Sequence, residues 1–264
     1  ADLVVTEAGF GADLGFEKFC HIVCPAAGIR PAAAVVVATV RALKSHGGVP
    51  FERLGEEDPE ALKRGSENLA AQLEVVRAFG VPAVVAVNRF PTDTPRELAL
   101  LEGLAREAGA RVALHEAYAR GGEGCLDLAR AVLEATQEPS GFRPLNPPGT
   151  PLREQIERIA THLYGADGVD LLPGAERDLE RLRAMGLGTA PVCMAKTHLS
   201  ISHDPALLGR PRGIRLPLRA LVPSAGAGFV VALCGDMQRM PGLGREPAFT
   251  RIDLDDEGRI TGLA

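Results

Sequence analysis

The stretch Val81-Pro-Ala-Val-Val-Ala-Val87 is wholly apolar and leads directly into the loop Asn88-Arg-Phe-Pro-Thr-Asp-Thr94. A second run, Ala33-Ala-Val-Val-Val-Ala-Thr39, is almost as apolar. Continuous apolar runs of this length are typical of parallel strands that are buried on both faces. Because amphipathic stretches alternate with such runs along the chain, the sequence predicts an α/β protein with a mostly parallel sheet and flanking helices.

The same patterning gives the expected elements and their order. Strands are expected at residues 2–6, 33–39, 81–87, 112–115, 168–172, 191–194, 214–221 and 229–235. Helices are expected at residues 58–79, 94–108, 126–137, 152–163 and 175–185. The segment 139–151 is rich in Pro and Gly and is typical of a linker or surface crossing. Beyond about residue 214 the helical periodicity is lost, which favours short strands and a smaller α+β carboxyl-terminal domain.

Composition excludes several classes of protein. With 264 residues the chain is long enough to bury a core, and its net charge of −5 disfavours nucleic acid or an anionic membrane as the main partner. No apolar run reaches the roughly 18 residues of a membrane helix. The five cysteines are odd in number and scattered, so reduced thiols in the cytoplasm are expected rather than a disulfide framework. Cys20, His21 and Cys24 have no second ligand cluster to complete a metal site.

The expected strand at residues 2–6 begins almost at the first residue. A buried strand at a natural terminus is unusual, because termini fray at the surface. We therefore expect the chain to be a piece of a longer polypeptide.

Glycines surround a single aromatic residue in Thr6-Glu-Ala-Gly-Phe-Gly-Ala-Asp-Leu-Gly15. Glycine permits close backbone approach, so this loop is able to lie against a flat ligand or a phosphate, with Phe10 projecting into a pocket. The alternative is a tight turn with Phe10 tucked under a helix.

Two further loops follow expected strands. Proline restrains Phe90 in the Phe90-Pro91 corner, which suits one wall of a slot for a planar heterocycle. Arg89 and Asp93 have a simpler interpretation as a surface ion pair and a helix cap. A GTP-type base-reading loop is disfavoured there by its spacing. Tyr118, in the loop after residue 115, offers another flat stacking surface.

The carboxyl-terminal part contains three more loops of interest. Cys193-Met-Ala-Lys-Thr-His-Leu-Ser-Ile-Ser202 carries groups able to hold phosphate or carboxylate, and a polar loop that closes a small domain explains it equally well. Ser224-Ala-Gly-Ala-Gly-Phe229 has small residues that let backbone amides approach a ligand. Met240-Pro-Gly-Leu-Gly244 has no chemical role that we can assign.

In their order and wording these loops resemble those of formate–tetrahydrofolate ligase, also called 10-formyltetrahydrofolate synthetase, over its carboxyl-terminal half. The resemblance implies that the pterin ring stacks between aromatic walls, with Tyr118 where the family usually has Trp. The implied pterin site is Phe10, Phe90, Pro91, Leu114 and Tyr118. The implied adenine contacts are Ser224, Ala225 and Ala227.

The resemblance also implies an activity and a domain organisation. ATP, bound with Mg²⁺, would phosphorylate formate, and formyl phosphate would then formylate tetrahydrofolate. Residues 1–65 would be the remnant of a nucleotide-binding domain of a P-loop-type NTPase-like enzyme, 66–166 a middle α/β domain with the folate loops, and 167–264 the smaller α+β domain. A homo-oligomer is expected.

One element of such an enzyme is missing from the sequence. No G-x-x-x-x-G-K-[ST] phosphate-binding loop is present. The resemblance places that loop in the amino-terminal half, so we expect this chain to be inactive alone and to need that half as a partner. Two alternatives remain open: a non-catalytic folate-binding or oligomerisation module, and an unrelated nucleotide-binding α/β domain.

Overall fold

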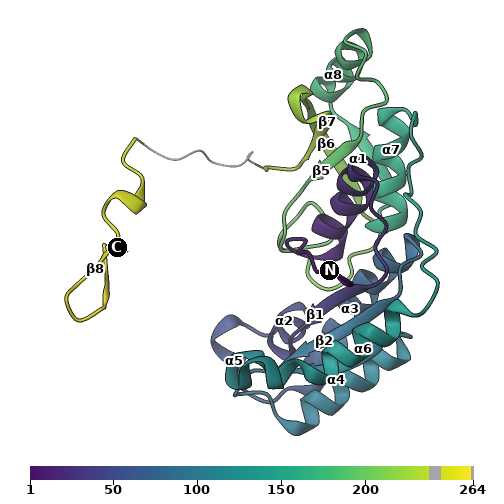
Figure 1. Ribbon diagram of the computed structural model, residues 1–264. Coiled ribbons are helices and arrows are strands. Elements are labelled where there is room, and N and C mark those ends of the chain that lie inside the picture. Colours follow the sequence, from purple (N-terminus) through teal and green to yellow (C-terminus); the bar gives the residue numbers. More distant parts are fainter. Residues whose placement is uncertain (238–244, 263–264) are drawn as a thin grey trace.

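The computed structural model describes residues 1–237 and 245–262. The loop Met240-Pro-Gly-Leu-Gly244 lies outside the described residues. Two lobes make up the main body, each built on its own sheet, and the segment 245–262 lies apart from them (Figure 1). This is the α/β architecture that the sequence predicts, with a parallel sheet in one lobe and a mixed sheet with helices in the other.

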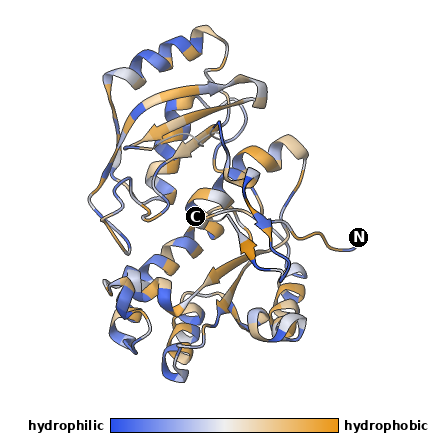
Figure 2. Ribbon diagram, turned by 90° about the vertical axis from the view of Figure 1, so that its left-hand side faces the viewer, coloured by the Kyte–Doolittle hydropathy of each residue, from blue (hydrophilic) through white to orange (hydrophobic). Residues whose placement is uncertain are grey.

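The first lobe contains sheet A, which is fully parallel in the order β1-β2-β3. Its strands are β1 (Ala34–Ala38), β2 (Ala83–Asn88) and β3 (Arg111–His115). The helices of this lobe are α2 (Val40–His46), α3 (Pro59–Ala78), α4 (Pro95–Glu107), α5 (Ala117–Arg120) and α6 (Leu126–Thr136). The strands of this lobe are mostly hydrophobic, whereas hydrophilic and hydrophobic residues alternate along its helices (Figure 2).

The second lobe contains sheet B, with strands in the order β4-β6-β7-β5. The strands are β4 (Gly168–Leu171), β5 (Val192–Ala195), β6 (Arg215–Ser224) and β7 (Phe229–Cys234). Only the β6–β7 pair is antiparallel. Helix α7 (Leu152–Arg158), the π-helical turn Ile159–Leu163 and α8 (Pro173–Ala184) accompany this sheet. The segment beyond the main body forms a small hairpin of β8 (Asp253–Leu254) and β9 (Ile260–Thr261).

A helical segment that sequence patterning missed lies between the lobes. It consists of the π-helical turns Ala12–Phe16 and Phe19–Val23, followed by α1 (Cys24–Ala27). Its first turn contacts α3 of the first lobe, and its second contacts β5 of the second lobe. π-Helical turns do not follow the 3.6-residue period, which is why the apolar spacing gave no helix signal here.

The expected strand at residues 2–6 is wrong. These residues have no regular structure, and the Leu3, Val4 and Val5 side chains are 52%, 85% and 92% exposed. A strand requires a neighbour for its main-chain hydrogen bonds, and within the described residues none pairs with this segment. The apolar pattern was present, but its pairing partner was not.

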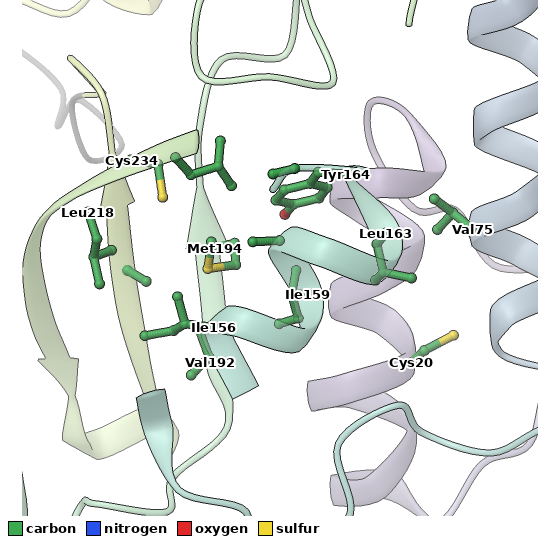
Figure 3. Packing of buried hydrophobic residues seen from close by; sticks show 14 of the residues in the cluster. Cys20, Val75, Ile156, Ile159, Leu163, Tyr164, Val192, Met194, Leu218 and Cys234 are labelled. Atoms are coloured by element: carbon green, nitrogen blue, oxygen red, sulfur yellow. The ribbon is translucent and has the colours of Figure 1, made fainter. Parts of the chain in front are cut away.

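Helix α3 contributes to the cores of both lobes. Leu62, Leu69 and Leu73 belong to the core beneath sheet A. Ala71 and Val75, on the opposite side of the helix, belong to the larger core that surrounds sheet B. In that larger core the side chains of the π-helical turn Ile159–Leu163 lie between strand β5 and the segment that precedes α1 (Figure 3).

The contact between α2 and α3 depends on Gly65. A Cβ atom at this position would overlap the Leu43 carbonyl, so Gly65→Ala would force the two helices apart. We expect this change to lower the free energy of unfolding by about 1–3 kcal/mol, measured by urea denaturation. Gly103→Ala in α4 is the matched control, because nothing lies within 4 Å of its Cβ position. We expect the control to be stabilised by about 0.5–1 kcal/mol, and equal effects of the two changes would contradict the proposed contact.

Candidate functional site

Two of the predicted aromatic residues, Phe90 and Tyr118, lie in segments that leave the carboxyl edge of sheet A. Strands β2 and β3 are parallel and in register, with Val87 opposite Leu114. The loop after β2 and helix α5 after β3 therefore leave the sheet at the same edge, and the Arg89 N–H donates to the His115 carbonyl, 3.1 Å away. The structure thus brings Phe90, Pro91, Leu114 and Tyr118 to one edge, where ligands of α/β proteins bind.

Asp93 fixes the Phe90-Pro91 corner. Its carboxylate accepts the Phe90 N–H at 2.8 Å, and its own N–H donates to the Phe90 carbonyl at 3.0 Å. The Asp93 side chain is buried, and burial raises its pKa although the bond from Phe90 opposes the shift. The helix cap that sequence patterning allowed for Asp93 belongs to Thr94, which forms a capping box with Glu97.

Tyr118 stands beside a network of charges. Its side chain is 97% exposed, so its ring is free to stack. Glu116 Oε1 lies 2.8 Å from Arg89 Nη1, and Glu116 Oε2 lies 3.2 Å from Arg120 Nη1. These two arginines lower the Glu116 pKa. The surface ion pair predicted for Arg89 is therefore present.

Arg41 is a residue of this edge that sequence analysis missed. It lies in the first turn of α2, directly after β1, and so reaches the same edge as Phe90. Its guanidinium lies 5.2 Å from the Phe90 ring centroid and 5.9 Å from that of Phe51, both within cation–π range. The only available signal was a basic residue two positions beyond an expected strand.

A buried ion pair joins helices α2 and α4, which follow strands β1 and β2 of sheet A. Lys44 Nζ lies 2.8 Å from Glu97 Oε1 and donates to the Glu56 carbonyl at 2.6 Å, and both side chains are almost fully buried. Glu97 also accepts the N–H groups of Asp58 and Thr94. Burial alone would raise the Glu97 pKa, but these bonds, with that from Lys44 foremost, lower it.

Phe10 lies against a different partner. Its ring stacks on His198, with centroids 4.9 Å apart, and its side chain is 76% exposed rather than tucked under a helix. Phe10 has a φ of 61°, a left-handed conformation that costs a non-glycine residue about 1–2 kcal/mol. His198 is thus a second aromatic neighbour that the sequence did not indicate.

Lys196 is buried and engaged within the protein. Its ammonium donates to Asp13 Oδ2 at 2.6 Å and to the Ser200 carbonyl at 2.7 Å. Burial lowers the Lys196 pKa, and Asp13 opposes the shift. These contacts support the polar-loop interpretation of residues 193–202 over a phosphate site.

His46, the last residue of α2, binds the main chain of the loop between β5 and β6. The Gly209 N–H donates to His46 Nδ1 at 3.1 Å, which requires that nitrogen to be unprotonated. Burial lowers the His46 pKa, with Asp13 opposing. The unfolded chain therefore binds the proton more readily, so this contribution is complete above about pH 6.5 and is lost as the pH falls.

As the pH falls from about 7 to 5, we expect the free energy of unfolding to decrease. Protonation of His46 alone accounts for at most about 1.4 kcal/mol per pH unit. Urea denaturation across that range measures the effect. His46→Gln removes the titrating group and should flatten the profile. An identical pH profile for the variant would contradict the role of His46.

The predicted adenine contacts lie in the second lobe. Ser224, Ala225 and Ala227 form the tight turn between β6 and β7, where the Gly228 N–H donates to the Ser224 carbonyl at 2.9 Å. The register of sheet B places this turn at the start of β7, whereas Lys196 follows the end of β5 at the other end of the sheet. The structure therefore does not bring this turn together with Phe10 or with the edge of sheet A.

Within residues 1–237 and 245–262, no three His, Cys, Asp or Glu side chains are grouped in a way that could hold a metal ion. Among the helices of those residues, none is long and apolar enough to cross a membrane.

The chain is a mostly parallel α/β protein in which aromatic and arginine side chains lie at the carboxyl ends of the strands of sheet A. In comparison with known proteins, the family model of formate–tetrahydrofolate ligase matches residues 1–264. The chain belongs to the formate–tetrahydrofolate ligase family.

Individual relatives show how much of the family the chain represents. It is 53% identical to the formate–tetrahydrofolate ligase of Symbiobacterium thermophilum and 52% identical to those of Saccharopolyspora erythraea and Roseiflexus castenholzii. Each match covers 100% of this chain and 48% of the relative. The chain therefore spans about half the length of the relatives it matches.

Proposed function

We propose that the chain supplies the tetrahydrofolate-binding part of a formate–tetrahydrofolate ligase, which makes 10-formyltetrahydrofolate from formate and ATP through formyl phosphate. The observation that carries this proposal is the gathering of Phe90, Pro91, Leu114 and Tyr118 at one edge of sheet A. A pterin is flat and stacks on aromatic faces. Tyr118 takes the place of the usual Trp and offers a smaller face.

The charges at this edge support the same proposal. Arg41, Arg89 and Arg120 all lie there, and the substrates of this reaction are anionic. Arginine holds phosphate and carboxylate groups through paired N–H donors. We propose that these side chains attract the formyl phosphate and the acidic tail of the folate to the edge.

Phe10 and the β6–β7 turn would hold the remaining ligand groups. We propose that Phe10 adds a further stacking face for the pterin and that Ser224, Ala225 and Ala227 contact the adenine of ATP. Mg²⁺ would enter with the phosphates of ATP. Since the turn is separate from the edge of sheet A, the nucleotide and the folate would be held by different surfaces.

The rest of the family polypeptide has a suitable place to dock. Strand β1 is at the edge of a parallel sheet, and its Val35 and Val37 side chains are 44% and 64% exposed. Parallel sheets are normally covered on both faces, so the exposed valines mark β1 as an outer strand that lacks part of its cover. We propose that the amino-terminal half extends sheet A beyond β1 and supplies the phosphate-binding loop. The domain division at residues 65 and 166 is part of this proposal.

Activity measurements test this function. We expect the purified chain alone to make no 10-formyltetrahydrofolate from formate, ATP and tetrahydrofolate. Mixing it with the amino-terminal half of the Symbiobacterium thermophilum enzyme should give product. Product from the chain alone would overturn the expected dependence on a second half.

A second candidate is a non-catalytic folate-binding or oligomerisation module. The segment 245–262 favours it, because Phe249, Leu254 and Ile260 are 65%, 63% and 60% exposed and offer an apolar surface to another copy. Binding of tetrahydrofolate without activity in the mixture above would support this candidate. Light scattering of the chain with and without residues 245–262 measures its part in assembly.

A further inference from the structure

One buried ammonium anchors two loops that carry aromatic rings. Lys196 donates to Asp13 in the segment that follows Phe10, and it also donates to the Ser200 carbonyl in the loop that carries His198. Asp13 and Lys196 are 183 residues apart in the sequence, and Asp13 lies in the segment between the lobes whereas Lys196 follows β5 of the second lobe. The two loops therefore converge on a single charge.

Asp13 is itself fixed on its other side. Its N–H donates to Gln72 Oε1 at 3.1 Å, and Gln72 Nε2 donates back to Asp13 Oδ1 at 2.9 Å. Gln72 lies in α3, so Asp13 connects that helix with Lys196. No freedom remains for the carboxylate, since both of its oxygens accept strong hydrogen bonds.

The backbone next to Asp13 carries this constraint to Phe10. A Cβ atom on Gly11 would overlap Asp13 Oδ1, and one on Gly15 would overlap the Gly9 carbonyl, so the loop is tightly packed. Such packing explains why Phe10 keeps its left-handed backbone conformation, because strained residues persist only where their surroundings determine them. The Phe10 ring is then delivered onto His198 while most of its surface stays exposed.

We propose that the Lys196–Asp13 ion pair is a positioning device that holds Phe10 and His198 together as one aromatic platform for the pterin, with His198 as a further ligand-contacting residue. This inference rests on the proposed tetrahydrofolate site. Lys196 and Asp13 act through the two rings and do not touch the ligand.

A tryptophan at Phe10 tests the positioning without any ligand. The chain contains no Trp, so Phe10→Trp gives a single reporter whose acrylamide quenching and fluorescence anisotropy measure the freedom of the ring. In this background Lys196→Met should raise the quenching constant about twofold and lower the anisotropy. Arg210→Gln is the matched control, since it removes a partly exposed ion pair with Glu74 that also joins the second lobe to α3, and it should leave the reporter unchanged.

A double variant separates positioning from stability. Lys196→Met leaves the Asp13 carboxylate buried without its cation, whereas Asp13→Asn combined with Lys196→Met removes both charges. We expect the double variant to regain much of the lost Tm while its reporter remains mobile. A reporter that recovers together with Tm, or one that Lys196→Met never loosens, would overturn the positioning role.

Calorimetric titration with tetrahydrofolate then tests the consequence in chains that keep Phe10. Lys196→Met and the double variant should each raise the Kd about tenfold, and His198→Ala should do the same with an unchanged Tm. If Lys196→Met loosens the reporter but the parent chain does not bind tetrahydrofolate, the proposed function is contradicted while the positioning role stands. Unchanged affinity in all three variants would overturn the platform.

Discussion

Replacing Phe90 with alanine is expected to raise the Kd for tetrahydrofolate by about 30-fold or more, which corresponds to about 2 kcal/mol. Phe90 is held in a rigid corner by Asp93 and proline, so its ring is preorganised for stacking. Truncation removes one whole wall of the proposed pterin slot. Isothermal titration of the purified chain measures the effect directly.

Phe51→Ala provides the control for this experiment. Phe51 also lies over Arg41, but it is outside the proposed slot and is 76% exposed. We expect this variant to bind tetrahydrofolate like the parent chain. Equal losses in both variants would point to Arg41 rather than to the Phe90 ring, and no heat from the parent chain would contradict a pterin site in this half.

Replacing Lys44 with methionine is expected to lower the free energy of unfolding by about 3–5 kcal/mol. The change leaves the Glu97 carboxylate buried without its cation, and Glu97 also holds the start of α4. The midpoint of urea denaturation measures the loss. Glu97→Gln combined with Lys44→Met removes the stranded charge and should recover much of it.

Arg53→Gln is the matched control for Lys44→Met. It breaks the nearby ion pair with Glu56, in which both side chains are exposed, 65% and 59% respectively. Exposed pairs add little because water screens them, so no measurable change is expected. A midpoint for Lys44→Met equal to that of the parent would contradict the structural role of the buried pair.

The elements found from sequence were those with strong apolar periodicity. Strands β1 to β3 and helices α3 and α4 have continuous apolar runs or clear caps, and the structure confirms them within a few residues. Their parallel order follows from alternating strands and helices, which is why Phe90 and Tyr118 could be expected at one edge.

The rest depended on contacts between residues distant in sequence. The expected strand at residues 2–6 has the right composition and no neighbour to pair with. The Phe10–His198 stack and the Lys196–Asp13 pair join positions more than 180 residues apart, and no local pattern encodes them. Arg41 lacked any signal beyond its place after a strand.

Helix α3 places one face in each core, and this has a consequence for how the protein unfolds. Leu62 and Leu73 of α3 pack in the core of the first lobe, and Ala71 and Val75, on its opposite side, pack in the core of the second. A lobe that opened on its own would have to separate α3 from one of these cores. The two lobes should therefore behave as a single cooperative unit, with one melting transition. The amides of α3 should then be among the slowest to exchange with solvent deuterium, at a rate set by global unfolding.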